Sequence, residues 1–314
     1  MSSDDTNTGD TATGDTATGH TDPIGWQQRG TVVGVDGSAG SLRALRWALA
    51  REDRFGDTVP VMVWEYPLWS SASLMAGAGA MPPAEQMHEA AHEAAVTTLE
   101  AEAPSLVERV VVREGSTATV LLEEAETASL LVVGSRGHGA LMSALLHSVG
   151  ASCAAHTPVP LVVVPDGTDH DPGSESILVG IDGSENSDEA LAWALSYAGA
   201  GDTVTAVGIW GIPAVTGFEQ VVLEPEAIES GTRAMVDDSV ARVCARLGAD
   251  RDRVSIDIRQ GDSRSILRSM SEQADVLTLG ARGAAGVAHW LFGSVTTSLV
   301  HRPVCPTVVV PHDE

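Results

Sequence analysis

The chain has 314 residues, of which 43% are hydrophobic, and it carries 43 acidic against 18 basic residues for a net charge of −25. This length predicts about two domains of ordinary size, and the charge argues against nucleic acid or an anionic membrane as a partner. The same negative field repels a nucleotide, so a nucleotide site here must offset it locally with Arg side chains, backbone dipoles or a metal ion.

The chain opens with a tail, residues 1–27, in which Thr, Gly, Asp and Ala recur. Its low apolar content predicts an acidic, disordered segment. We identify no signal peptide at the start and no apolar run of about 18 residues, the length of a membrane span. The cysteines Cys153, Cys244 and Cys305 lie far apart, a usage that fits buried thiols in a reducing compartment. We therefore expect a cytoplasmic protein.

Apolar runs and helical stripes alternate through a first domain, residues 28–167. Short runs rich in Val, Leu and Ile are typical of strands in a covered parallel sheet, whereas Ala-rich and Leu-rich stripes at helical spacing indicate helices. Pro60 weakens the second strand, and residues 68–81 are expected to form a surface loop. Strands are predicted within 31–38, which ends in a turn at Asp36, Gly37 and Ser38, and at 58–67, 106–114, 130–135 and 160–165. Helices are predicted at 41–53, 82–103 and 117–127.

After a linker at 168–175, the same pattern begins again in a second domain, residues 176–314. The spacing between matching residues is constant, because Asp182 follows Asp36, Trp193 follows Trp47 and Gly280 follows Gly134 by 146 positions each. Alternating strands and helices favour parallel units with right-handed crossovers. The sequence therefore predicts an α/β protein with two tandem, five-stranded, parallel open-sheet domains, each with a ligand site at the carboxyl ends of its strands.

A glycine-rich loop follows the fourth strand of each domain. In the second domain Gly280 and Gly283 lie three apart, and Gly293 and Ser294 then begin a helical segment. Glycine allows close backbone approach or positive φ, and a helix N-terminus favours an anion. The first domain repeats this loop at Gly134, Gly137 and Ser148, but His147 stands where the last glycine is expected.

The pattern G-x2-G-x9-G-[ST], together with an Asp at the end of an earlier strand, resembles the ATP-binding signature of the universal stress protein family. The resemblance covers nearly all of both domains and implies the adenine nucleotide alpha hydrolase-like fold. It implies ATP contacts from two sets of residues: Gly180, Asp182, Ile209, Gly280, Ala281, Arg282, Gly283, Gly293, Ser294 and Val295 in the second domain, and Gly34, Asp36, Val63, Gly134, Arg136, Gly137 and Ser148 in the first.

Several of these residues also have a purely structural interpretation. Asp36 and Asp182, which the resemblance places near the nucleotide or an accompanying Mg²⁺, are also suited to an Asx-turn or a helix cap. Gly34 and Gly180 are equally suited to close packing, Val63 and Ile209 to the core, and Arg136 and Arg282 to solvated or ion-paired positions. The histidines show no metal-ligand spacing.

Other nucleotide machinery is excluded by the residues themselves. A chain without Lys has no Walker A loop, the first strands lack a Rossmann glycine pattern, and no nucleophile or base stands at motif spacing. The resemblance thus implies a stress-responsive sensor or regulator that binds ATP or another adenine nucleotide, and His147 in the first loop favours the second domain as the main site. A slow metal-dependent ATP hydrolase and a nucleotide-free interaction module remain open, as do pairing of the two domains within the chain and a homodimer.

Overall fold

The computed structural model describes residues 29–65, 82–137, 149–167, 173–211, 224–283 and 293–311. The predicted tail, the predicted loop at 68–81, His147 and Ser148 lie outside these ranges.

The first domain alternates strands and helices as its sequence pattern predicts. Its elements are β1 (Thr31–Gly34), α1 (Ala39–Leu49), α2 (Glu52–Phe55), β2 (Thr58–Trp64), α4 (Ala84–Glu102), the 3₁₀ helix η1 (Pro104–Arg109), β3 (Val111–Glu114), α5 (Thr117–Ala125), β4 (Leu130–Gly134), α6 (Val149–His156) and β5 (Leu161–Val164).

The second domain repeats this order. Its elements are β6 (Ser176–Ile181), α7 (Glu185–Tyr197), β7 (Thr203–Trp210), α8 (Pro225–Leu247), the 3₁₀ helix η3 (Arg251–Arg253), β8 (Val254–Gln260), α9 (Ser263–Ser271), β9 (Val276–Gly280), α10 (Ser294–His301) and β10 (Thr307–Val310).

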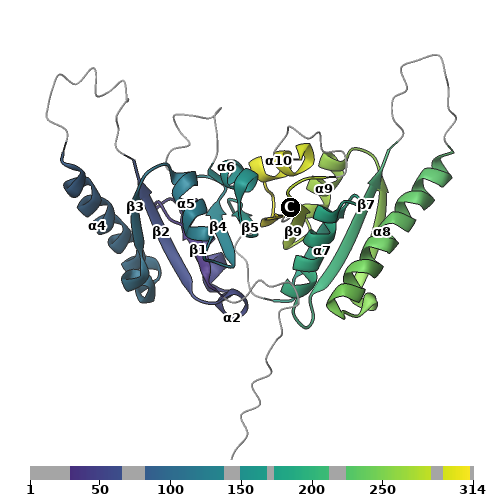
Figure 1. The fold of residues 1–314 in the computed structure, drawn as a ribbon, viewed down its shortest axis with the longest axis horizontal. Helices are drawn as coiled ribbons and strands as arrows, with labels where there is room; N and C mark the ends of the chain where they lie inside the picture. The colour runs from purple at the N-terminus through teal and green to yellow at the C-terminus, as the bar shows by residue number, and fades with distance from the viewer. Residues whose placement is uncertain are drawn as a thin grey trace, which may run out of the picture.

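The ten strands form one sheet in the order β3-β2-β1-β4-β5-β10-β9-β6-β7-β8. The strands within each domain are parallel, and the domains meet where β5 pairs with β10 in the antiparallel sense. Figure 1 shows the two domains side by side, with the last strand of each at the centre. The predicted fold class, two tandem five-stranded parallel sheets, is confirmed.

Helices cover both faces of the sheet and bury one continuous core on one of them. That core contains Leu45 of α1, Leu99 of α4, Leu191 of α7 and Val240 of α8, so it crosses the junction between the domains. The opposite face is covered by α5 and α6 in the first domain and by α9 and α10 in the second, and Val300 of α10 packs into the first domain's cluster.

The strand predicted at 106–114 is wrong over its first part. Pro104 begins η1, which continues to Arg109, and β3 starts only at Val111. A Pro at the start of a helical turn is favourable because its fixed φ suits the turn and its missing N–H is not needed there. Pro60, by contrast, lies inside β2: it pairs with Val33 of β1, and β3 joins the other side of β2 only from Val61 onward.

The three cysteines are buried and unpaired, as predicted. Burial raises the pKa of Cys153 and of Cys305 to about 12, so both thiols stay protonated and unreactive at neutral pH. Among the described helices, none is both long and apolar enough to cross a membrane.

Candidate functional site

A cavity of about 740 Å³ opens at the carboxyl ends of β6, β7 and β9, between the first residues of α9 and those of α10. This is the edge at which open α/β sheets hold their ligands, because the loops there leave a crevice between neighbouring strands. The described residues that line it are Gly180, Ile181, Asp182, Ser187, Val207, Ile209, Ser263, Arg264, Leu267, Leu279, Gly280, Arg282, Gly283, Gly293, Ser294, Val295, Thr296, Thr297 and Ser298.

The residues predicted for the second domain come together around this cavity, with the exception of Ala281. The Ala281 carbonyl instead accepts a hydrogen bond from the Gly293 N–H at 3.1 Å, and its own N–H donates to the Val310 carbonyl at 3.0 Å. These two bonds fasten the start of α10 to the end of β9 and to β10. Thr296 adds a third, because its hydroxyl donates to the Gly280 carbonyl at 3.0 Å.

Gly280 and Gly283 are required by packing. A Cβ on Gly280 would stand 2.6 Å from the Asn186 carbonyl oxygen, and one on Gly283 would stand 2.5 Å from Asp182 Oδ2. Both distances are far below van der Waals contact, so neither position accepts a side chain without a shift of its neighbours. Gly134 and Gly137 show the same crowding in the first domain, where the neighbours are Gly40 and Asp36.

Gly293 differs from this pair, because the described residues around it leave room for a side chain. Its φ is −68°, a value that any residue adopts, so the positive φ that a loop glycine can supply is not used here. Among the described residues, a Cβ would meet its nearest neighbours, the Ala281 oxygen and the Gly283 nitrogen, at 3.6 Å, which is ordinary contact. What Gly293 contributes is therefore open space at the wall of the cavity.

The N-termini of α9 and α10 both border the cavity, but only that of α9 is capped by a side chain. Asp262 caps α9, accepting a hydrogen bond from the Ser265 N–H at 3.0 Å, and its hydrogen bonds with Ser265 hold the pKa of Asp262 below its usual value. The N-cap of α10 is Gly293, which has no side chain to offer. The first N–H groups of a helix lack partners within the helix, so those of α10 are suited to an anion in the cavity.

Asp182 forms the Asx-turn predicted as its structural role. Its Oδ1 accepts hydrogen bonds from the Ser184 N–H at 3.1 Å and the Ser184 hydroxyl at 2.6 Å. Its Oδ2 lies on the side of Gly283, at the cavity wall. Asp36 repeats the turn in the first domain, where Oδ1 accepts from the Ser38 N–H at 2.9 Å. A structural role for one carboxylate oxygen is thus compatible with a ligand role for the other.

The cavity is locally more positive than the protein as a whole. Its ionisable groups among the described lining residues are two guanidinium groups, Arg264 and Arg282, and one carboxylate, Asp182. This local excess of positive charge counters the net charge of −25, which otherwise repels an anionic ligand. Sequence reasoning missed Arg264, although comparing the repeats could have found it, because the matching first-domain residue, 146 positions earlier, is Ala118.

The first domain keeps part of this arrangement. Gly34 lies at the end of β1, Val63 is partly buried near the end of β2, and Gly137 lies against Asp36 as Gly283 does against Asp182. Arg136, however, forms an ion pair with Asp166 at 3.2 Å, and Asp166 also binds Arg43. Ser148 cannot be placed, because it lies outside the described residues.

Within the described ranges, no group of three or more His, Cys, Asp or Glu side chains could hold a metal ion. The residues present still fit Mg²⁺ that arrives with a polyphosphate, because Mg²⁺ in such sites usually takes one or two carboxylates and completes its shell with phosphate oxygens and water. Asp182 is the carboxylate in the cavity that could serve.

Comparison with known proteins matches the chain twice to the universal stress protein family, at residues 29–165 and 173–311. A universal stress protein of Mycolicibacterium smegmatis is 30% identical over 300 residues, covering 90% of this chain and 96% of that protein. One from Mycobacterium tuberculosis is 27% identical over 313 residues, covering 90% and 96%. In the solved structure of a universal stress protein from Archaeoglobus fulgidus, the fold matches with a TM-score of 0.63 at 19% identity, over 91% of this chain and 100% of that one. With both halves matched and the sheet order repeated in each, the chain belongs to the universal stress protein family.

Proposed function

We propose that this protein binds ATP, or another adenine nucleotide with a phosphate chain, in the cavity of its second domain and acts as a stress-responsive sensor or regulator. The observation that carries the proposal is the convergence on one cavity of a helix N-terminus without a side-chain cap, the open space at Gly293, and the guanidinium groups of Arg264 and Arg282. Together they supply N–H donors and positive charge for phosphate. The apolar side chains of Val207, Ile209 and Leu267 line the cavity as well and suit an adenine ring.

Two differences between the repeats favour the second domain as the main site. His147 replaces the glycine that leaves open space at Gly293, and Ala118 replaces Arg264. Each difference removes either space or positive charge from the first domain.

The first test is the stoichiometry of ATP binding to the full-length protein, measured by calorimetry and by mass spectrometry of any nucleotide released from it. We expect close to one ATP per chain. A chain that neither carries nor takes up an adenine nucleotide would overturn the proposal and leave an interaction module as the function. Two equivalent sites per chain would show that the first domain is as competent as the second.

Asp182→Asn tests the role of Mg²⁺. We expect about a tenfold loss of ATP affinity in the presence of Mg²⁺ and a much smaller change, or a slight gain, in its absence, because a carboxylate beside a polyphosphate is repulsive unless a hard cation lies between them. An Asn side chain can still accept the hydrogen bonds from Ser184, so the turn should survive. The matched control is Asp36→Asn in the first domain. Equal losses with and without Mg²⁺ would assign Asp182 a direct contact with ribose or adenine.

The hydrolase alternative concerns the same cavity. Among the described lining residues, Asp182 is the one carboxylate that could act as a general base, and one of its oxygens is already engaged by Ser184. A binding site therefore accounts for these residues better than a hydrolytic one. Steady-state release of phosphate from ATP, followed with and without Mg²⁺, separates the two.

A further inference from the structure

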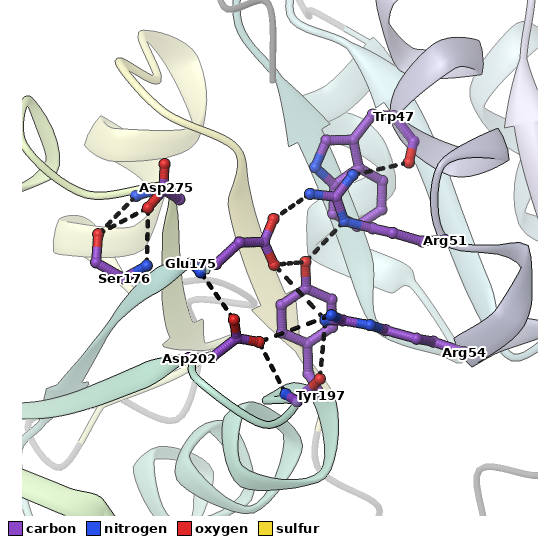
Figure 2. Close-up of polar contacts among 9 residues, drawn as sticks. Trp47, Arg51, Arg54, Glu175, Ser176, Tyr197, Asp202 and Asp275 are labelled. Atoms are coloured by element: carbon purple, nitrogen blue, oxygen red, sulfur yellow. Dashed lines mark hydrogen bonds and ion pairs between the residues drawn. The ribbon is translucent and has the colours of Figure 1, made fainter. Parts of the chain in front are cut away.

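A buried polar cluster joins the two domains near the amino ends of the strands, at the opposite end of the sheet from the cavity. Figure 2 shows Arg51, which follows α1, reaching Glu175, which precedes β6, and Tyr197, the last residue of α7. The side chains of Arg51 and Glu175 are only 4% and 6% exposed. A charge is stable in such surroundings only beside a hydrogen-bonded partner of opposite sign. Two domains can therefore pack together here only if their buried charges are complementary.

Arg51 uses all three nitrogens of its guanidinium group. Its Nε donates to the Tyr197 hydroxyl at 2.7 Å, one Nη donates to the Trp47 carbonyl at 3.1 Å, and the other binds the Glu175 carboxylate. The Tyr197 hydroxyl in turn donates to Glu175. The guanidinium also lies 4.2 Å from the centre of the Trp47 ring.

Arg54 makes a second link of the same polarity. One Nη donates to the Tyr197 carbonyl at 3.0 Å and lies 3.6 Å from Glu175, while the other lies 3.7 Å from Asp202. In both links the first domain supplies the cation, and the anion is Asp202 of the second domain or Glu175, the residue directly before β6.

This cluster lies on the pseudo-two-fold axis that relates the repeats. Arg51 and Tyr197 are 146 residues apart, the offset of the duplication, so they are the same position in the two domains. The β5–β10 ladder shows the same symmetry, because Val162 pairs with Val308, and 308 − 162 = 146. In a symmetric pair of identical domains, each of these residues would face a copy of itself.

Pairing two first domains would concentrate positive charge in this buried place. Both copies of Arg51 and Arg54 would come together, and the position of Glu175 would be held by Arg29, the residue 146 positions earlier. Burial of like charges without counterions is strongly unfavourable and is a common way to reject a wrong partner.

Pairing two second domains would concentrate negative charge instead. Both copies of Glu175 and Asp202 would come together without the cations that face them now, because Tyr197 stands at the position of Arg51 and Ala200 at that of Arg54. Only the pairing of a first domain with a second domain places opposite charges together.

We propose that this cluster is a selectivity lock, formed by Arg51, Arg54, Glu175, Tyr197 and Asp202, through which the β5 edge of a first domain accepts only a second domain. The occupant is the second domain of the same chain. Residues 165–175 alone separate β5 from β6, and so short a tether gives the partner domain a high effective concentration. The lock thus closes the sheet within one chain and rejects the symmetric pairing of two copies through β5 or through β10.

Disulfide cross-linking at Val162 of β5, which lies on this axis opposite Val308 of β10, shows which strands pair. Opposed residues of an antiparallel pair have Cα atoms about 4.5–5.5 Å apart, within the range for a disulfide. In the full-length protein, Val162→Cys alone should give no disulfide-linked dimer under mild oxidation. Val162→Cys with Val308→Cys should give an internal disulfide at the monomer mass of 32.5 kDa. A linked dimer from the single variant would show like-with-like pairing, and a linked dimer from the double variant would show exchange between chains; either would overturn the proposal.

The lock itself is tested by adding Glu175→Arg to Val162→Cys, which gives position 175 the residue type of its first-domain counterpart Arg29 and makes the closed cluster cationic. We expect a disulfide-linked dimer to appear, at about tenfold or more above the background of Val162→Cys alone, and the Tm to fall by about 5–10 °C. The matched control is Arg46→Glu, a charge reversal on α1 that breaks the exposed ion pair with Glu102 and should change neither quantity. If Glu175→Arg behaves as Arg46→Glu does, the cluster has no selective role. Should Glu175→Arg fail to fold, Glu175→Gln gives the same comparison with a smaller effect.

Discussion

Replacing Gly293 with Val is expected to lower ATP affinity by at least ~100-fold while the protein remains folded. The Val side chain would occupy the space at the start of α10 from which N–H groups can reach a phosphate. Loss of two charge-assisted hydrogen bonds of about 1.5–3 kcal/mol each is sufficient for that effect. Stability should change little, because among the described residues the nearest atoms to a Cβ at this position are 3.6 Å away. Calorimetric titration with ATP and a thermal melt measure the two quantities.

Two other glycines serve as controls for this variant. Gly231 lies in α8, and no atom of another described element lies within 4 Å of its Cβ position, so Gly231→Val should leave ATP affinity unchanged. Gly280→Val should instead lower stability, because its Cβ would overlap the Asn186 carbonyl oxygen. A folded Gly293→Val protein with wild-type affinity would remove the start of α10 from the site.

Removing both arginines of the cavity is expected to weaken ATP binding by about 100-fold and adenosine binding by much less. Arg264 and Arg282 are the cations among the described lining residues, and each exposed contact with phosphate is worth about tenfold. A nucleoside without phosphates makes no such contact. Parallel titrations of Arg264→Ala, Arg282→Ala and the double variant with ATP, AMP and adenosine measure the effect of phosphate number.

Arg268 provides the matched control on α9. Its guanidinium donates to the Arg302 carbonyl at 2.7 Å and is not among the described residues that line the cavity, so Arg268→Ala should retain ATP affinity. The reciprocal change Ala118→Arg places a cation at the matching position of the first domain. Equal losses for ATP and adenosine in the double variant would mean that the arginines support the shape of the cavity and do not bind phosphate.

The duplication and the fold of each half could be predicted from the amino-acid sequence alone. The constant offset of 146 positions and the covered apolar strands depend on local pattern, and the structure repeats one strand order in both domains. Local pattern also indicated the carboxyl edge of the sheet as the place of the site, because parallel strands must end there together. It failed at residues 106–110, where Pro104 favours a 3₁₀ turn over the apolar pattern of a strand.

The reasons for the individual glycines and charges emerged only from the tertiary structure. Gly283 and Gly293 belong to one motif, yet the first is required by contact with Asp182 and the second leaves space in a cavity. Arg264 belongs to no recognisable motif, and it becomes a candidate site residue only because α9 places it in the same cavity as the glycine loop. The pairing of Arg51 with Glu175 joins residues 124 positions apart. Such contacts depend on how the two sheets meet, which no local pattern encodes, because the same strands could close on a copy of themselves or on each other.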